Sequence, residues 1–355
     1  MKHLFAIISL CLIQACAETP KALYLSPANN TGAGDLQVWP KSDEVPRYAY
    51  AGELTGQGNF RTSPDHRPNR AVEFLSWIVG LDPGRAEQPV ILQRPQGGTV
   101  DRQGRIYVSD VSRQAVFVFD PILGELHVWE WAEKSRRFQS PVGLVVREDG
   151  EVLVADSELG QVVRLSPDGK PRGVFGNGDL QRPTGVALDR ESGRVYVADT
   201  RANDIKIYDH QGRLVGSFGD AGDGAGQLNS PTYLAIADGR VYVTDTLNAR
   251  IQVFDTQGRW LQLIGERGHY IGNLNRPKGL AVTPDGLLYV AESYYDYLLV
   301  FDRSGEFLMP IGGPGSEPGE FTLPAGVWLD DHGRVYVSDM LNGRISIFQF
   351  LGADT

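Results

Sequence analysis

The sequence predicts an all-β fold assembled from six copies of one four-stranded unit. The chain has 42 glycines and 21 prolines, yet 41% of its residues are hydrophobic. This composition is typical of many short strands joined by turns around an apolar core. Two features recur at intervals of 42 to 48 residues. The landmark prolines are Pro95, Pro141, Pro183, Pro231, Pro277 and Pro324. The landmark acids, each ending a strand of the Tyr-Val-Ala/Ser type, are Asp110, Asp156, Asp199, Asp245, Glu292 and Asp339.

The third unit shows how one copy is built. Its expected strands are 184–189, 194–199, 205–208 and 214–218, and they are separated by turns rich in Gly and polar residues. Four short strands of this kind form a small antiparallel sheet. Six such sheets arranged radially form a propeller.

The same pattern carries a family resemblance. It reads Pro-x-Gly-Val-Ala, then Gly-Arg-Val-Tyr-Val-Ala-Asp, then Asn-x-Arg-Ile-x-Val-Phe, and it is clearest at Pro231–Phe254 and Pro324–Phe348. The pattern resembles the NHL repeat over roughly residues 94–350, which implies a six-bladed β-propeller. The resemblance does not determine activity, because one fold carries many functions.

Counting strands predicts how the ring closes. The last unit ends with a strand at 344–350, so its fourth strand is missing. Upstream, Arg47–Gly52 has the right pattern, and Gly52–Pro64 matches the loops that leave other units. We therefore expect an N-terminal strand to close a propeller over 47–350, which leaves a short tail at 351–355 and protects the sheet edge.

The N-terminus predicts export. Residues 1–15 contain Lys2, an apolar run and small residues before Cys16, as in a signal peptide. Ile13-Gln14-Ala15-Cys16 resembles the lipobox of bacterial lipoproteins, which implies fatty acylation (palmitate) of Cys16. A plain secretory signal is the alternative. Ala17 does not resemble the aspartate of an inner-membrane retention signal, which favours the outer membrane facing the periplasm.

Two segments are expected outside the regular repeats. Residues 16–46 contain four prolines and predict a flexible tether between the anchor and the propeller. The segment 65–93 predicts an insertion with one short helix around Ala71–Ile78, which packs on the propeller. A contact of this helix with a membrane surface or a partner is the alternative.

Charge excludes one class of partner. The formal net charge is −10, and the scattered arginines form no long basic run. Because phosphate backbones are repelled by such a surface, no nucleic-acid partner is expected.

The landmark acids have two interpretations. Six equally spaced carboxylates predict either a ring of metal ligands or a repeated turn in which each acid accepts backbone N–H groups. The turn is favoured because every blade needs it. None of the residues that follow the landmark prolines is His, Cys, Asp or Glu; they are Gln96, Val142, Thr184, Thr232, Lys278 and Ala325.

Related enzymes use other ligands. An amidating lyase related to NHL proteins holds zinc with axial histidines, and calcium lactonases of similar architecture use Glu, Asn and Asp. The chain's histidines after the signal do not fit that zinc site; they are His66, His127, His210, His269 and His332. No metal and no cofactor is therefore predicted.

The candidate ligand face lies where the repeats differ. Short hairpins occupy one face of the ring, so the longer loops of the opposite face should carry any site. In blade five, Ser293–Tyr297 replaces the usual Thr-Leu-Asn-Ala-Arg. The candidate residues are Tyr233, His269, Tyr270, Lys278, Glu292, Tyr294, Tyr295 and Tyr297. They form a patch suited to a sugar or a protein partner, although the tyrosines could equally cap the ring.

Two functions follow. The first is a membrane-anchored envelope lipoprotein that serves as a non-enzymatic binding or scaffold module for an unknown protein or glycan. The second is a hydrolase or lyase, lactonase-like or amidating-lyase-like, with a site at the central channel mouth that uses Lys278, Tyr233 and Glu292.

Overall fold

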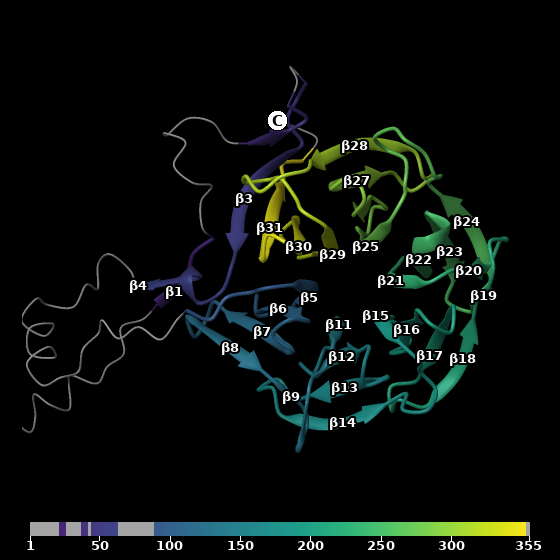
Figure 1. The fold of residues 1–355 in the computed structure, drawn as a ribbon, viewed down its shortest axis with the longest axis horizontal. Coiled ribbons are helices and arrows are strands. Elements are labelled where there is room, and N and C mark those ends of the chain that lie inside the picture. The colour runs from purple at the N-terminus through teal and green to yellow at the C-terminus, as the bar shows by residue number, and fades with distance from the viewer. Residues whose placement is uncertain (1–20, 26–36, 42–43, 63–88, 353–355) are drawn as a thin grey trace, which may run out of the picture.

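The computed structural model describes residues 21–25, 37–41, 44–62 and 89–352. These residues form a ring of six antiparallel sheets around a central axis (Figure 1). Cys16, the signal peptide and the predicted helix around Ala71–Ile78 lie outside the described residues. Within the described part of the chain, no helix is both long enough and apolar enough to cross a membrane.

The strands occupy four radial positions, as the third unit predicts. The innermost strands are β5 (Pro95–Val100), β11 (Pro141–Val146), β15 (Pro183–Leu188), β21 (Pro231–Ala237), β25 (Pro277–Val282) and β29 (Pro324–Leu329). The second strands are β6 (Ile106–Asp110), β12 (Val152–Asp156), β16 (Val195–Asp199), β22 (Arg240–Asp245), β26 (Leu288–Glu292) and β30 (Arg334–Asp339). The third strands are β7 (Ala115–Asp120), β13 (Gln161–Leu165), β17 (Asp204–Tyr208), β23 (Arg250–Asp255), β27 (Tyr297–Phe301) and β31 (Arg344–Phe350). The outer strands are β8 (Glu125–Trp129), β14 (Pro171–Phe175), β18 (Leu214–Phe218), β24 (Trp260–Ile264), β28 (Phe307–Gly312) and β3 (Tyr48–Leu54).

The apolar cores lie between neighbouring blades. Each sheet is covered on its two faces by the two neighbouring sheets. The second strand β16 is therefore buried at every residue, whereas the outer strand β18 is mostly exposed. Between blades three and four, Tyr196 and Ile205 join Leu234 and Val243 in one cluster. The propeller is therefore stabilised by contacts between blades that recur around the ring.

The innermost strands approach one another so closely that side chains are excluded at one position in five of the six blades. This is the glycine two residues after the landmark proline. A Cβ atom on Gly143 would lie 2.4 Å from the Thr184 carbonyl oxygen, and one on Gly326 would lie 2.1 Å from the Gln96 carbonyl oxygen. Glycine is needed there for close backbone approach rather than for an unusual backbone angle.

The ring closes as the strand count predicts. Strand β3 pairs antiparallel with β31, from Tyr48 opposite Phe350 to Leu54 opposite Ile345. The closing strand thus covers 48–54 rather than 47–52. The Tyr48 and Tyr289 hydroxyls are 2.9 Å apart, which ties the closing strand to blade five.

The tether prediction is wrong for two stretches of 16–46. Strand β2 (Val38–Trp39) pairs with β3 as a fifth strand of blade six, and β1 (Lys21–Leu23) pairs with β4 (Phe60–Thr62). Trp39 is only 4% exposed, and its ring meets Phe348 edge-on with ring centroids 5.3 Å apart. The edge of β3 is open to another strand, and burial of the tryptophan stabilises the pairing.

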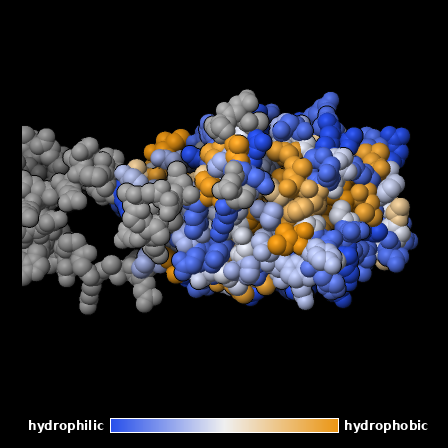
Figure 2. Space-filling model, turned by 90° about the horizontal axis from the view of Figure 1, so that it is seen from above, coloured by the Kyte–Doolittle hydropathy of each residue, from blue (hydrophilic) through white to orange (hydrophobic). Residues whose placement is uncertain are grey.

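The remaining elements are short. They are η1 (Gln57–Asn59), η3 (Thr246–Asn248), β9 (Trp131–Glu133), β10 (Arg136–Arg137), β19 (Asp220–Ala221) and β20 (Gln227–Leu228). Figure 2 views the ring from its side and shows hydrophobic residues exposed among hydrophilic ones on the rim. Exposed apolar side chains of the outer strands include Val215, Leu261, Leu263 and Leu308.

Trp39 gives the first testable prediction. We expect Trp39→Ala to lower the free energy of unfolding by about 3 kcal/mol or more, because it empties a packed site against Phe348. Urea denaturation measures the change. Val45→Ala is the control, since Val45 is 48% exposed in the same segment and should change stability by less than about 0.5 kcal/mol. Equal stability of the two variants would show that β2 contributes nothing to closure.

Candidate functional site: the loop face and the channel mouth

The landmark acids join two segments at one point of each blade. Asp156 is fully buried. It accepts the backbone N–H groups of Gln139 and Ser140 at 2.8 and 3.0 Å, from the loop before the innermost strand. It also accepts those of Glu158 and Leu159 at 3.2 and 3.1 Å, from the turn after the second strand. One carboxylate thus satisfies four donors that a buried turn would otherwise leave unpaired.

The other blades use the same arrangement with small changes. Asp110, Asp199 and Glu292 also accept backbone N–H groups from both segments. In blade four, Asp245 still accepts the Asn229 N–H from the first segment at 2.6 Å. In place of the turn N–H groups it takes side-chain donors, from Asn248 and from Arg250 Nε, each at 2.8 Å. This is the Asn-x-Arg part of the repeat, and it recurs in blade six on Asp339.

This geometry confirms the turn interpretation of the landmark acids. Burial raises the pKa of Asp156 and of Asp339, while the N–H groups that they accept act in the opposite direction. Their oxygens are occupied by the fold. Across the described ranges, no group of three or more His, Cys, Asp or Glu side chains is arranged to hold a metal ion.

The sequence interpretation missed a second link between blades. In blades two to four a Ser or Thr follows the landmark acid directly, and its hydroxyl donates to the carbonyl of the next landmark proline. Ser157 reaches Pro183 at 2.7 Å, and Thr200 reaches Pro231 at 2.7 Å. Thr246 does the same for Pro277. The repeated Asp-Ser/Thr pair was the available signal.

We call the end of the ring that carries the landmark acids and the loops between blades the loop face. Four of the candidate residues lie together there. Tyr294 and Tyr295 contact edge-on with ring centroids 4.9 Å apart. The Tyr295 hydroxyl points to the Gly268 carbonyl at 3.5 Å, next to His269 and Tyr270. Tyr270 is 82% exposed and Tyr294 is 61% exposed, so both are available to a partner.

Glu292 needs correction as a ligand-face residue, and Tyr297 is only partly exposed. Glu292 is fully buried, and its carboxylate accepts four backbone N–H groups, including those of Arg276 and Tyr295. The longer side chain therefore serves the same turn as aspartate in other blades. Tyr297 packs its ring into the cluster between blades four and five. The buried Glu292 is therefore not available to a ligand, whereas part of the Tyr297 side chain stays accessible.

Tyr233 and Lys278 lie on the innermost strands around the channel. Tyr233 replaces the glycine of the other blades and lines a central hollow of about 210 Å³ that all six innermost strands enclose. Its hydroxyl is buried, has no hydrogen-bond partner in the described part of the chain, and has a raised pKa caused by burial. Burial lowers the pKa of Lys278, and the nearby Arg276 and Arg94 guanidiniums lower it further.

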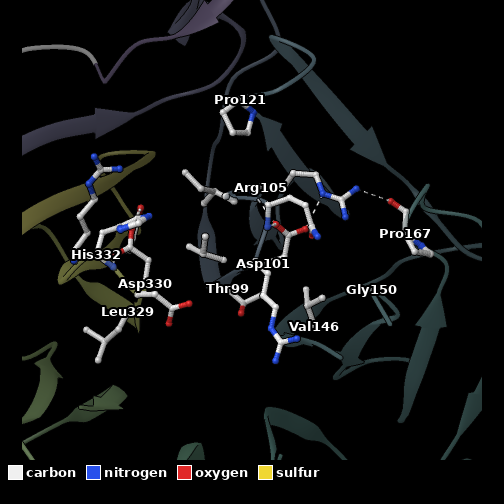
Figure 3. A pocket seen from close by; sticks show the side chains of 18 of the residues that line it. Thr99, Asp101, Arg105, Pro121, Val146, Gly150, Pro167, Leu329, Asp330 and His332 are labelled. Carbon is white, nitrogen blue, oxygen red and sulfur yellow. Dashed lines mark hydrogen bonds and ion pairs between the residues drawn. The ribbon is translucent and has the colours of Figure 1, made fainter. Parts of the chain in front are cut away.

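A larger hollow, of about 1010 Å³, opens at the opposite end of the ring, among the hairpins of blades one, two and six. We call this end the hairpin face. Figure 3 shows Asp101, Arg105, Asp330 and His332 around it. The Asp101 carboxylate is bound by Arg105 and by the Tyr107 hydroxyl. The sequence does not predict this hollow, since only short hairpins are expected at this face.

Comparisons with known proteins identify the fold. Models of the NHL repeat match residues 180–208 and 228–254, and a family described as a 6-bladed beta-propeller matches residues 275–353. The chain is a six-bladed β-propeller with NHL repeats. The repeat motif quoted for residues 231–254 lies within one of these matches, and that for residues 324–348 lies within the 6-bladed family match.

Curated relatives match parts of the propeller. A gluconolactonase of Zymomonas mobilis is 30% identical over 129 residues, which cover 32% of this chain and 36% of the relative. NHL-repeat-containing protein 4 of Homo sapiens is 35% identical over 24% of this chain and 65% of its own length. Protein brain tumor of Drosophila melanogaster is 27% identical over 35% of this chain and 12% of its own length. The matches thus span less than two thirds of each relative.

Solved structures agree on the fold alone. A virginiamycin B lyase of Staphylococcus aureus has a TM-score of 0.56 at 15% identity and covers 73% of this chain and 96% of its own. A gluconolactonase of Xanthomonas campestris has a TM-score of 0.54 at 15% identity and covers 74% and 89%. At this identity the likeness concerns the path of the propeller chain.

The turn role of the landmark acids can be measured. Asp156→Asn replaces an acceptor oxygen by an NH₂ group that faces N–H donors, so we expect a loss of about 2 kcal/mol in the free energy of unfolding. Asp223→Asn is the matched control, because Asp223 is exposed and makes no interaction within the described residues. Guanidinium denaturation of both variants measures the difference. An unchanged stability of Asp156→Asn contradicts the structural role.

Proposed function

We propose that this propeller is an envelope lipoprotein that binds a protein or glycan partner through its loop face without catalysing a reaction. The supporting observation is an asymmetry among the blades. Two residues after each landmark acid, blades one to six read Ser112, Glu158, Arg201, Leu247, Tyr294 and Leu341. The residue at this position is polar in blades one to three, and it is apolar or aromatic in blades four to six.

The apolar half of the loop face is exposed. Leu247 is 53% exposed and Leu341 is 54% exposed. An apolar side chain on a loop is free to turn toward the protein, but these two face the solvent. Tyr270 and Ile271 add to the same side, since their loop precedes blade five. Apolar and aromatic side chains gathered on one surface are characteristic of binding sites rather than of a solvated surface. Arg201 and Glu158 on the other half are suited to the rim of such a site.

The proposed location rests on the N-terminal sequence. Two or three acyl chains on Cys16 would hold the protein durably at a membrane, because each buried methylene contributes about 0.8 kcal/mol. We place the protein at the outer membrane, facing the periplasm. The partner is not a nucleic acid, because the net charge of −10 opposes a phosphate backbone.

Cys16 provides a direct test of the anchor. We expect Cys16→Ser to abolish labelling by radioactive palmitate and to move the protein from the membrane to the soluble fraction. Cys11→Ser is the control, since Cys11 lies within the apolar run of the signal and should not affect labelling. Retention of the label in Cys16→Ser would refute the lipoprotein proposal.

The binding proposal is tested at the exposed aromatics. The native lipoprotein is purified from membranes, its co-purifying component is identified, and affinity is measured with the wild-type and variant proteins. We expect Tyr270→Ala and Tyr294→Ala to weaken binding about tenfold each, at unchanged melting temperature. Leu261→Ala on the rim, where Leu261 is 44% exposed, is the control and should bind normally. A lower melting temperature with unchanged affinity would assign both tyrosines to packing.

An enzyme remains the second candidate. It is favoured by the partial match to a gluconolactonase and by two groups near the channel, the Lys278 amine and the buried Tyr233 hydroxyl. A lysine of lowered pKa is a better base at neutral pH than an ordinary one. Turnover of a lactone by the purified protein, lost in Lys278→Met, would replace the binding proposal with this one.

A further inference from the structure

We infer that an apolar turn of blade one, residues 121–123, rests on the lipid bilayer beside the proposed anchor at Cys16. The hairpin-face corner of blade one is then the surface through which the propeller meets the membrane. This inference rests on the lipoprotein anchor of the proposed function, and it adds the contact surface and the orientation of the ring.

The chain between the anchor and the propeller is short. Strand β1 begins at Lys21, only five residues after Cys16. A fully extended chain covers at most about 3.6 Å per residue, so Lys21 lies within about 18 Å of the acylated residue. That distance is shorter than the hydrocarbon core of a bilayer, which is about 30 Å thick. The part of the propeller to which β1 is attached is therefore held close to the lipid.

Strand β1 is attached to the hairpin face of blade one. It pairs with β4, with Leu23 opposite Phe60. The Phe60 ring stacks on Phe119 of blade one, with ring centroids 6.2 Å apart. Leu23 and Leu25 pack on the apolar cluster between blades six and one, and both line the hairpin-face hollow, where Pro121 also lies (Figure 3). Packing on the propeller thus fixes the point at which the anchored chain arrives.

The turn between β7 and β8 lies against this attachment point. A Cβ atom on Gly124 would lie 2.0 Å from the Lys21 carbonyl oxygen, so the backbone of β1 passes in contact with the turn. The same turn exposes two large apolar side chains, since Ile122 is 70% exposed and Leu123 is 62% exposed. The short chain from the anchor and an exposed apolar pair therefore meet at one corner of the ring.

The fold holds this turn in one shape. The Asp120 carboxylate accepts the backbone N–H groups of Ile122 and Leu123, each at 2.9 Å. The Asp120 carbonyl accepts the Gly124 N–H at 3.0 Å. Because the turn is already ordered, contact with a lipid surface costs it little conformational entropy.

The equivalent turns of the other blades are different. In blades two to five, two residues stand between the end of the third strand and the turn glycine, and apart from one proline they are polar. They are Pro167 and Asp168, His210 and Gln211, Thr256 and Gln257, and Arg303 and Ser304. Blade one has one residue more, and its turn is apolar throughout. The repeat does not need an exposed Ile-Leu pair, and such a pair is typical of a surface that contacts an apolar phase.

The charge of the protein favours apolar contact over attraction to anionic lipid. The net charge is −10, and the exposed Glu125 follows the turn. Two apolar side chains alone bind a bilayer weakly. A lipid anchor a few residues away makes their contact intramolecular in effect, and the two signals together hold the surface in place.

The orientation of the ring follows from this contact. The hairpin face and the loop face are opposite ends of the propeller. With the hairpin-face corner of blade one at the lipid, the loop face is directed away from the bilayer. Tyr270 and Tyr294, which are the most exposed aromatics of that face, then stay accessible to a partner.

A dye at the turn tests the contact. The two cysteines of the chain are Cys11, which leaves with the signal, and Cys16, which is acylated, so Leu123→Cys carries the only free thiol of the mature lipoprotein. This thiol is labelled with a polarity-sensitive dye, and the lipoprotein is reconstituted in phosphatidylcholine vesicles that contain spin-labelled lipid. Gln257→Cys, at the equivalent exposed position of blade four, is the matched control. We expect the dye at position 123 to be quenched about threefold more than the dye at position 257, in low and in high salt alike.

A second substitution tests the apolar side chain itself. Ile122→Ser in the protein labelled at position 123 should lower the quenching about threefold, because it removes half of the apolar pair. Leu308→Ser is the control, since Leu308 is 49% exposed on the rim strand β28 and should leave the quenching unchanged. The melting temperature, which neither exposed substitution should change, reports folding.

The outcomes are distinct. Weak quenching at position 123, or equal quenching at positions 123 and 257, overturns the inference. The lipoprotein proposal survives that result if Cys16 still carries the palmitate label. If Cys16 carries no label, the dye is read again with the soluble protein and added vesicles. Quenching at position 123 then leaves the lipid contact standing without the anchor, and its absence removes both.

Discussion

The buried carboxylate at the end of each second strand is the interaction on which the ring depends. It gathers N–H groups from the loop before the innermost strand and from the turn after the second strand, as Asp156 does with four of them. Because both segments donate to the same carboxylate, the acid fixes where the innermost strand begins. It thereby fixes the position of every landmark proline along the propeller axis. It also fixes the residues on either side of that proline. A charge-assisted bond of this kind is stronger than a neutral one.

This dependence separates the residues that build the fold from those that can serve a ligand. The acids repeat because each blade needs the same turn, and even Glu292 is used in this way despite its extra methylene. Function is expected at positions that the turn holds rigid but does not use. The residue before each landmark proline meets that description, since its backbone is bound on both sides while its side chain is free. In blades one, three and five that residue is an arginine.

The sequence was sufficient for the repeat and for the closing strand. Strand patterns and acids recur along the sequence with one period, and the missing fourth strand of blade six could be found by counting. It was not sufficient for Trp39, because a proline-rich segment gives no strand signal and its pairing depends on an edge that exists only after closure. It was not sufficient for the hollow at the hairpin face either. Most of the residues that line this hollow come from blades one, two and six, and only the closed ring brings those blades together.

Closure also completes the apolar half of the loop face. The exposed Leu247, Tyr294 and Leu341 follow the acids of blades four to six, so they belong to three consecutive blades. Blade six receives its outer strand only when β3 pairs with β31, so the position of Leu341 depends on closure of the ring. Apolar contact supplies affinity through the area that it removes from water. A partner with an extended apolar surface would cover all three blades at once, whereas a small polar ligand would leave these side chains in water.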